Sequence, residues 1–276
     1  MSSFRPFDSR APRDPDRAAA RICGAGPDGR AAAGPGGATI ERAPSVRVAA
    51  ARRAGRTGTR LRGLARWLAG IGLAVLAGGA PAVAAQMPPT RVFIIHGYGA
   101  SPSDHWFSWL AQALERRGAA VTILDLPRPD APTPETWQRA LREQIAEPDA
   151  RTWFVAHSLG GIALLRYLTQ AADIRRIGGF VLVSGFNAPL PGLPQLDAFV
   201  VPDLDTPRLV RMAAQRIVVA AEDDAIVPYA SSRHLAEALD ARFVSVARGG
   251  HFLRSDGYTQ FPLLLGLIEG MPGFMR

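Results

Sequence analysis

The stretch Thr152–Gly161, TWFVAHSLGG, joins an apolar run to a serine and then to two glycines. The run is apolar without alternation, which is typical of a strand covered on both faces of a sheet. Ser158 follows where this strand ends and a helical pattern begins. A serine in that place, flanked by small residues, fits the nucleophile-elbow pattern G-x-S-x-G. Ala156 replaces the first glycine and Gly160 keeps the second, so the pattern alone also fits an ordinary structural serine.

The same alternation of strand and helix patterns covers the chain from Arg91 onward. The expected strands are residues 91–97, 121–127, 152–158, 178–185, 216–222 and 242–247. The expected helices are residues 104–117, 134–146, 159–172, 207–215, 231–239 and 258–269. Successive β-α units of this kind predict an α/β fold, a mainly parallel, doubly wound sheet of about six strands with helices on both faces. The Pro-rich connection 186–207 is expected to be an irregular surface segment.

The basic residues are concentrated before the predicted domain. Residues 1–86 hold 14 of the 32 basic residues and 5 of the 24 acidic ones, so the net charge of +8 belongs to this segment. The remaining 18 basic and 19 acidic residues nearly cancel. A nucleic-acid partner is therefore not expected, because no excess of positive charge is left for the folded part.

Two different patterns divide the N-terminal segment. Residues 1–60 lack apolar periodicity, so we expect them to be disordered or to be a leader upstream of the true start of translation. Residues 61–85 combine a basic prelude, an apolar run and small residues, the arrangement of a signal peptide cleaved after Ala84 or Ala85. The alternative is an uncleaved membrane anchor, in which case the membrane is a partner. We expect residues 87–276 to be the mature domain of a periplasmic or secreted protein, with a cytoplasmic or membrane-anchored protein as the alternatives.

Candidate partners for Ser158 lie where other expected strands end. His251 follows the last strand in a Gly-Gly loop, from which an imidazole can reach the serine and act as its base. Three acidic residues, 222–224, follow the fifth strand and offer a carboxylate for the histidine. Asp224 is preferred because Pro228 lies four residues further on. The chain order Ser158, Asp224, His251 is the order of a catalytic triad in α/β-hydrolases.

Acyl transfer also needs backbone N–H groups that bind the developing oxyanion. Leu159 N–H lies at the start of a helix, and Tyr98 N–H lies in the glycine-containing loop after the first strand. Trp106 follows this loop and either lines the acyl pocket or packs its helix on the sheet. No metal or other cofactor is expected, because the sequence has neither a cluster with metal-ligand spacing nor a glycine-rich nucleotide motif.

Five segments, taken in order, resemble one family. They are FIIHGYGASPSDHWFSWL (93–110), VAHSLGG (155–161), LVSGFNAPLPGLPQLDAF (182–199), AEDDAIVP (221–228) and GGHF (249–252). Together they resemble the compact YdeN-like serine hydrolases, relatives of the vertebrate retinoblastoma-binding serine hydrolase. The resemblance implies a minimal α/β-hydrolase with little or no cap, and it places the family's Ser, Asp and His on Ser158, Asp224 and His251. Many such relatives are cytoplasmic, so the expected export signal departs from the family.

The expected function is a serine hydrolase, carboxylesterase-like, that cleaves small-molecule acyl esters through an acyl-enzyme. An amidase or peptidase would use the same three residues. A catalytically silent hydrolase-fold protein that binds a partner is the alternative from another class. The sequence leaves the oligomeric state and the identity of the acyl group open.

Overall fold

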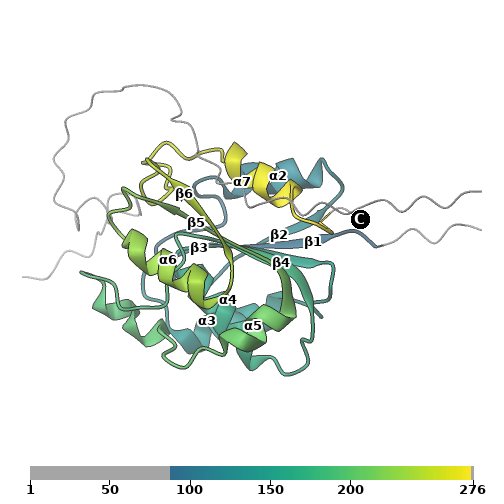
Figure 1. Cartoon of the computed structure of the whole chain (residues 1–276), viewed down its shortest axis with the longest axis horizontal. Helices are drawn as coiled ribbons and strands as arrows, with labels where there is room; N and C mark the ends of the chain where they lie inside the picture. Colours follow the sequence, from purple (N-terminus) through teal and green to yellow (C-terminus); the bar gives the residue numbers. More distant parts are fainter. Residues whose placement is uncertain (1–87, 275–276) are drawn as a thin grey trace, which may run out of the picture. The chain divides into compact units, whose positions relative to one another are not determined.

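The computed structural model describes residues 88–274, so the expectations for residues 1–60 and 61–85 fall outside the described residues. Its strands are β1 (Arg91–Ile95), β2 (Ala120–Leu124), β3 (Thr152–His157), β4 (Ile177–Val183), β5 (Ala213–Ala221) and β6 (Arg242–Val246). They form one sheet in the order β2-β1-β3-β4-β5-β6, and every neighbouring pair is parallel (Figure 1). The predicted six-stranded α/β fold is confirmed.

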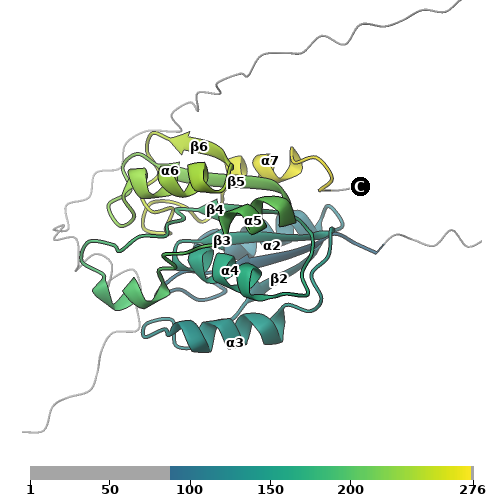
Figure 2. The same cartoon turned by 60° about the horizontal axis from the view of Figure 1, so that its bottom comes forward.

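Helices cover both faces of this sheet. They are α2 (Phe107–Glu115), α3 (Pro134–Gln144), α4 (Leu159–Gln170), α5 (Thr206–Met212), α6 (Tyr229–Ala238) and α7 (Pro262–Glu269). Figure 1 shows α2 and α7 on one face and the other four on the opposite face, and Figure 2 shows α3 and α4 side by side. None of the helices within residues 88–274 is long and apolar enough to cross a membrane.

The covered faces explain why the strands are apolar without alternation. Along β3, Trp153 and Val155 pack into the core beneath α2 and α7, whereas Phe154 and Ala156 pack into the core on the other face. Every residue of β3 is buried. A strand between two helical layers has no solvent-facing side, so each position is selected for apolar contact.

The structure differs from the prediction at two connections. The helix expected over 207–215 ends at Met212, and β5 begins at Ala213, which pairs with Ile177 of β4. Pairing with a neighbouring strand here outweighs the local helical pattern. The connection 186–207 is more ordered than expected, because it contains the 3-10 helix η1 (Pro194–Phe199) and buries Leu196 and Phe199 in the core.

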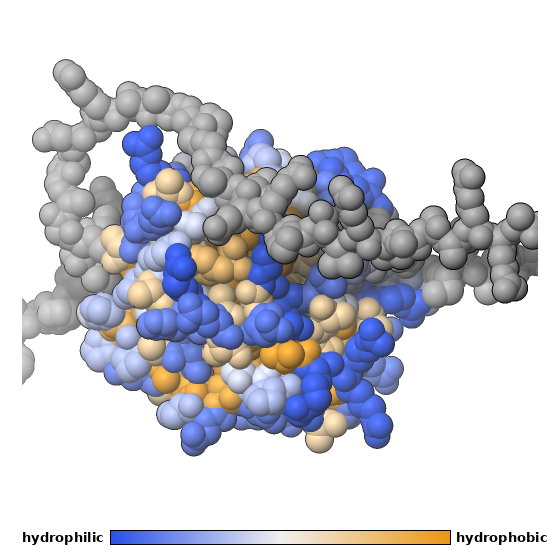
Figure 3. All heavy atoms as spheres, viewed as in Figure 1, coloured by the Kyte–Doolittle hydropathy of each residue, from blue (hydrophilic) through white to orange (hydrophobic). Residues whose placement is uncertain are grey.

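The surface of the described domain carries both hydrophilic and hydrophobic residues. In the view of Figure 3, hydrophilic residues are spread over the described domain with smaller hydrophobic areas between them.

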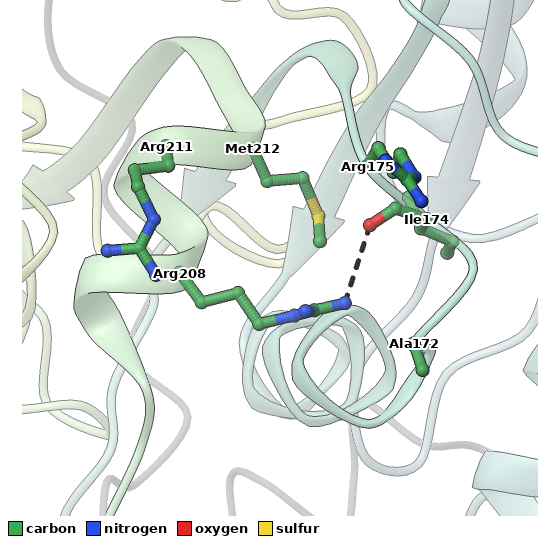
Figure 4. Close-up of a pocket in the computed structure, with 6 residues that line it drawn as sticks. All are labelled: Ala172, Ile174, Arg175, Arg208, Arg211 and Met212. Atoms are coloured by element: carbon green, nitrogen blue, oxygen red, sulfur yellow. Dashed lines mark hydrogen bonds between the residues drawn. The ribbon is translucent and has the colours of Figure 1, made fainter.

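A cavity of about 330 Å³ lies where α4 ends and α5 approaches it, lined by Ala172, Ile174, Arg175, Arg208, Arg211 and Met212 (Figure 4). The Arg208 guanidinium donates to the carbonyl oxygens of Ala171 and Ile174 and so closes the end of α4. Figure 4 shows Arg211 directed away from that guanidinium, so the arginines do not converge on one point.

Candidate active site

Ser158 occupies the sharp turn between β3 and α4. Its backbone angles are φ 52° and ψ −124°, a conformation that costs free energy for any residue other than glycine. Two backbone hydrogen bonds hold the turn: Ser158 N–H donates to Val183 O, and Gly161 N–H donates to Ser158 O, both at 2.8 Å. The strained serine at a strand-to-helix junction has the geometry of a nucleophile elbow.

The residues on either side of Ser158 are small for different structural reasons. A Cβ added to Gly160 would lie 2.4 Å from His96 O, so the end of β1 and the start of α4 approach too closely for any side chain. Ala156 is fully buried and pairs with Ile95 on one side and Leu182 on the other, and its methyl group packs into the core beneath α4. The alanine is therefore accommodated, and the turn keeps its strained form without the first glycine.

Asp224 and His251 form a buried pair at the ends of β5 and β6. His251 Nδ1 lies 2.8 Å from Asp224 Oδ2, and the two side chains are 6% and 2% exposed. The other carboxylate oxygen, Oδ1, accepts the N–H groups of Ile226 and Val227, both at 2.9 Å. Burial by itself raises the pKa of Asp224, but the hydrogen bonds from His251 and the backbone outweigh it and leave the pKa lowered. An ionised Asp224 assigns the proton to Nδ1 of His251 and leaves Nε2 as the basic nitrogen.

The three adjacent acidic residues have three different partners. Of the three, only Asp224 is hydrogen-bonded to the His251 side chain. Asp223 Oδ1 accepts the N–H groups of Gly249 and Gly250 at 2.8 and 2.9 Å and so anchors the loop before the histidine. Glu222 Oε1 accepts the hydroxyl of Ser245 at 2.8 Å on the exposed side of β6. The preference for Asp224 as the partner of His251 agrees with this arrangement.

Side chains that the sequence analysis did not single out hold the backbone of His251. Asp256 Oδ2 accepts His251 N–H at 2.9 Å, and the His157 ring, through Nε2, donates to His251 O at 2.9 Å. His105 Nδ1 accepts the N–H of Arg254 at 3.0 Å. Asp256 precedes a glycine, and this pair of residues is typical of a turn, so the sequence could have indicated its role in the loop. The sequence around His105 and His157 does not indicate their hydrogen bonds to the loop.

The two supporting histidines are neutral at physiological pH. Burial lowers the pKa of His105 to about 4, and burial lowers the pKa of His157 well below its usual value. The His157 ring also lies close to the His251 ring, with 4.9 Å between the centroids and 50° between the planes. Among the residues that the structure describes, Ser158 Oγ has no hydrogen bond to His251. Catalytic hydrogen bonds in free enzymes are often long and tighten only when substrate binds.

The loop after β1 lies directly against the serine. A Cβ added to Gly97 would lie 3.0 Å from Ser158 Cβ. Within residues 88–274, Tyr98 N–H makes no backbone hydrogen bond, and Leu159, as the first residue of α4, has no acceptor within its helix. His96 fixes the loop: its Nδ1–H donates to Gly97 O at 2.9 Å, and its Nε2 accepts Leu126 N–H at 3.1 Å.

Trp106 lies in the core. Its side chain is fully buried and packs edge-on against Phe107 and Phe261, with ring centroids 4.7 and 5.7 Å apart. This environment favours the interpretation that Trp106 packs its helix on the sheet over the one in which it lines the acyl pocket. Within the described part of the chain, no group of three or more His, Cys, Asp or Glu residues is placed to hold a metal ion.

Comparison with known proteins agrees with this geometry. The model of the family "Serine hydrolase" matches residues 92–269. Hydrolase YdeN of Bacillus subtilis (strain 168) is 40% identical over 178 residues, which cover 64% of this chain and 94% of that protein. Serine hydrolase RBBP9 of Rattus norvegicus is 22% identical over 187 residues, 66% of this chain and 96% of that protein. The crystal structure of the B. subtilis ydeN gene product matches with a TM-score of 0.65 at 39% identity, covering 66% of this chain and 98% of that one. The chain therefore belongs to the serine hydrolase family and has the fold of an α/β-hydrolase.

Proposed function

We propose that this protein is a carboxylesterase-like hydrolase that cleaves small acyl esters through an acyl-enzyme on Ser158. The observation that carries the proposal is the buried, hydrogen-bonded pair of His251 and Asp224. The pair lies at the carboxyl ends of the strands, where the strained Ser158 also lies. The same three residues would serve an amidase, so the bond that is cleaved is part of the proposal and is tested below. The proposal extends family membership to a bond type and to named residues.

The proposed reaction begins when His251 Nε2 removes the proton of Ser158 Oγ, which attacks the ester carbonyl. Asp224 stabilises the imidazolium that results and keeps its ring oriented. His251 then gives the proton to the departing alcohol. Water attacks the acyl-enzyme with the same histidine as base, which releases the acid and restores Ser158.

The developing oxyanion would be bound by the N–H groups of Tyr98 and Leu159. Both are backbone donors beside Ser158, one in the loop after β1 and one at the start of α4. Donors fixed before the reaction stabilise charge that appears only in the transition state, and loss of one such donor costs roughly 10²–10³-fold in kcat. The placement of these donors favours acyl transfer.

Labelling of the full chain with a fluorophosphonate, followed by peptide mapping, tests the proposal. We expect an adduct on Ser158 that is lost in His251→Ala and kept in His234→Ala, a matched change at an exposed histidine of α6. Hydrolysis of short p-nitrophenyl esters should exceed that of the anilides with the same acyl group. A folded protein without an adduct would exclude the proposed nucleophile and favour a silent binding protein, and faster cleavage of anilides would replace esterase by amidase.

A further inference from the structure

Ser184 lies at the carboxyl end of β4 and is fully buried. Its backbone has φ 49°, in the left-handed region that a residue other than glycine enters at a cost. Ser184 N–H donates to Val219 O at 2.8 Å, so the pairing of β4 with β5 continues through this strained residue. Its hydroxyl donates to Asp224 Oδ2 at 2.8 Å. Such a strained conformation persists only where the surrounding contacts hold the residue in place.

The oxygen that accepts this hydroxyl is the one that faces the histidine. Asp224 Oδ2 accepts both Ser184 Oγ–H and His251 Nδ1–H, each at 2.8 Å. Oδ1 is occupied separately by two backbone N–H groups. Ser184 therefore competes with His251 for the negative charge on one oxygen. Among the described residues, no side chain other than those of His251 and Ser184 is hydrogen-bonded to this carboxylate.

Building on the proposed function, we propose that Ser184 is a positioning residue of the catalytic pair: it fixes Asp224 Oδ2 toward His251 and limits how strongly the carboxylate attracts the imidazolium. A carboxylate that already accepts a hydroxyl holds the protonated histidine less tightly. The Asp224–His251 pair then holds the proton taken from Ser158 less tightly and passes it on more readily to the leaving alcohol. The hydroxyl thus extends activity toward acid.

Other charged or titratable groups lie on the elements packed around the loop of His251. They are His157 at the end of β3, His105 before α2, Asp223 after β5, and Arg254 and Asp256 in the loop of His251 itself. Burial keeps the pKa of His105 and of His157 below the range in which an esterase is assayed, so neither histidine titrates there. None of these five side chains is bonded to Ser184, so its replacement leaves their contacts with the loop in place.

The test compares Ser184→Ala and Ser184→Gly in the full chain, with Ser232→Ala as the matched control. Ser232 is also a buried serine, and its hydroxyl donates to Gly185 O at 2.7 Å rather than to the carboxylate. We expect both Ser184 variants to move the acid limb of the kcat/KM profile by about 0.5–1 pH unit to higher pH. This is part of the roughly 1–2 units that one hydrogen bond to a charged group is worth, because the hydroxyl acts on His251 only through Asp224. Ser232→Ala should leave the limb in place.

A second readout requires no turnover. The Nδ1 proton of His251, assigned by its loss in His251→Gln, should move in the proton NMR spectrum of Ser184→Ala and stay in place in Ser232→Ala. An unchanged resonance and an unchanged acid limb would overturn the role of Ser184. Recovery of the wild-type profile in Ser184→Gly alone would also overturn it, because backbone strain and not the hydroxyl would then be responsible. Failure of wild-type labelling would instead reject the proposed function, and the resonance would still decide the inference about Ser184.

Discussion

The backbone of Ser158 links stability to the proposed chemistry. A glycine at this position would make the same backbone hydrogen bonds as Ser158. The strain at φ 52° therefore serves only to present the serine hydroxyl at the turn. A glycine adopts the same angles freely. The protein should therefore become more stable when the proposed nucleophile is removed together with its Cβ, and not when the hydroxyl alone is removed.

We predict that Ser158→Gly raises the free energy of unfolding by about 1 kcal/mol relative to Ser158→Ala, since alanine keeps the strain and glycine relieves it. Neither variant should react with a fluorophosphonate. Urea denaturation of the two variants beside the wild type measures the difference. Equal stability of the alanine and glycine variants would show that the turn stores no strain.

The loop after β1 shows how one side chain sets the orientation of a peptide group. His96 is fully buried, and both of its ring nitrogens are used, one by Gly97 O and one by Leu126 N–H. Gly97 O and Tyr98 N–H belong to the same planar peptide, so fixing the carbonyl also fixes the direction of the N–H. Gly99 N–H donates to Pro129 O at 2.9 Å and holds the other end of the loop.

Two substitutions separate the bonds of His96. His96→Asn places an amide N–H near the position of Nδ1 and retains the bond to Gly97 O, whereas His96→Gln places an acceptor near the position of Nε2 and retains the bond to Leu126 N–H. We predict that His96→Gln loses roughly tenfold in kcat, with little change in KM, and that His96→Asn loses much less. Only His96→Gln releases the peptide that carries Tyr98 N–H, the proposed oxyanion donor. A larger loss of kcat in His96→Asn than in His96→Gln would mean that the bond to Leu126 N–H, which joins the two loops, matters more than the bond to Gly97 O.

The elements themselves could be predicted from the sequence because strands covered on both faces have a simple apolar pattern. The ends of elements were harder to predict: residues 213–215 fit a helix locally, and only pairing with β4 makes them the start of β5. The pairing of Asp224 with His251 could be predicted from Pro228, four residues after Asp224, and the resulting order along the chain matched that of α/β-hydrolases. The bonds from His157 and His105 to the histidine loop could not be predicted, since they join residues 94 and 149 positions apart that meet only in the folded chain.

The stability of the folded protein depends on pH because several of its buried histidines are neutral. His105 is 7% exposed and accepts Arg254 N–H through Nδ1, a bond that a protonated ring cannot accept. Burial lowers its pKa from 6.5 to about 4. As pH falls from 6.5 toward 4, the unfolded chain binds a proton here that the folded protein does not, so stability present above pH 6.5 is lost over this window. Burial lowers the pKa of His96 and of His157 as well, so these two residues act in the same direction.

We predict that His105→Asn makes the protein less sensitive to acid without weakening it at neutral pH. Asparagine tolerates the φ of 51° at this position, and its side-chain oxygen can accept Arg254 N–H without titrating. The loss of unfolding free energy between pH 7.5 and pH 4.5, measured by urea denaturation, should be smaller in the variant by an amount on the order of 2–3 kcal/mol. An equal loss in both proteins would mean that His105 titrates alike in the folded and unfolded states, and the acid sensitivity would then belong to His96, His157 and the carboxylates.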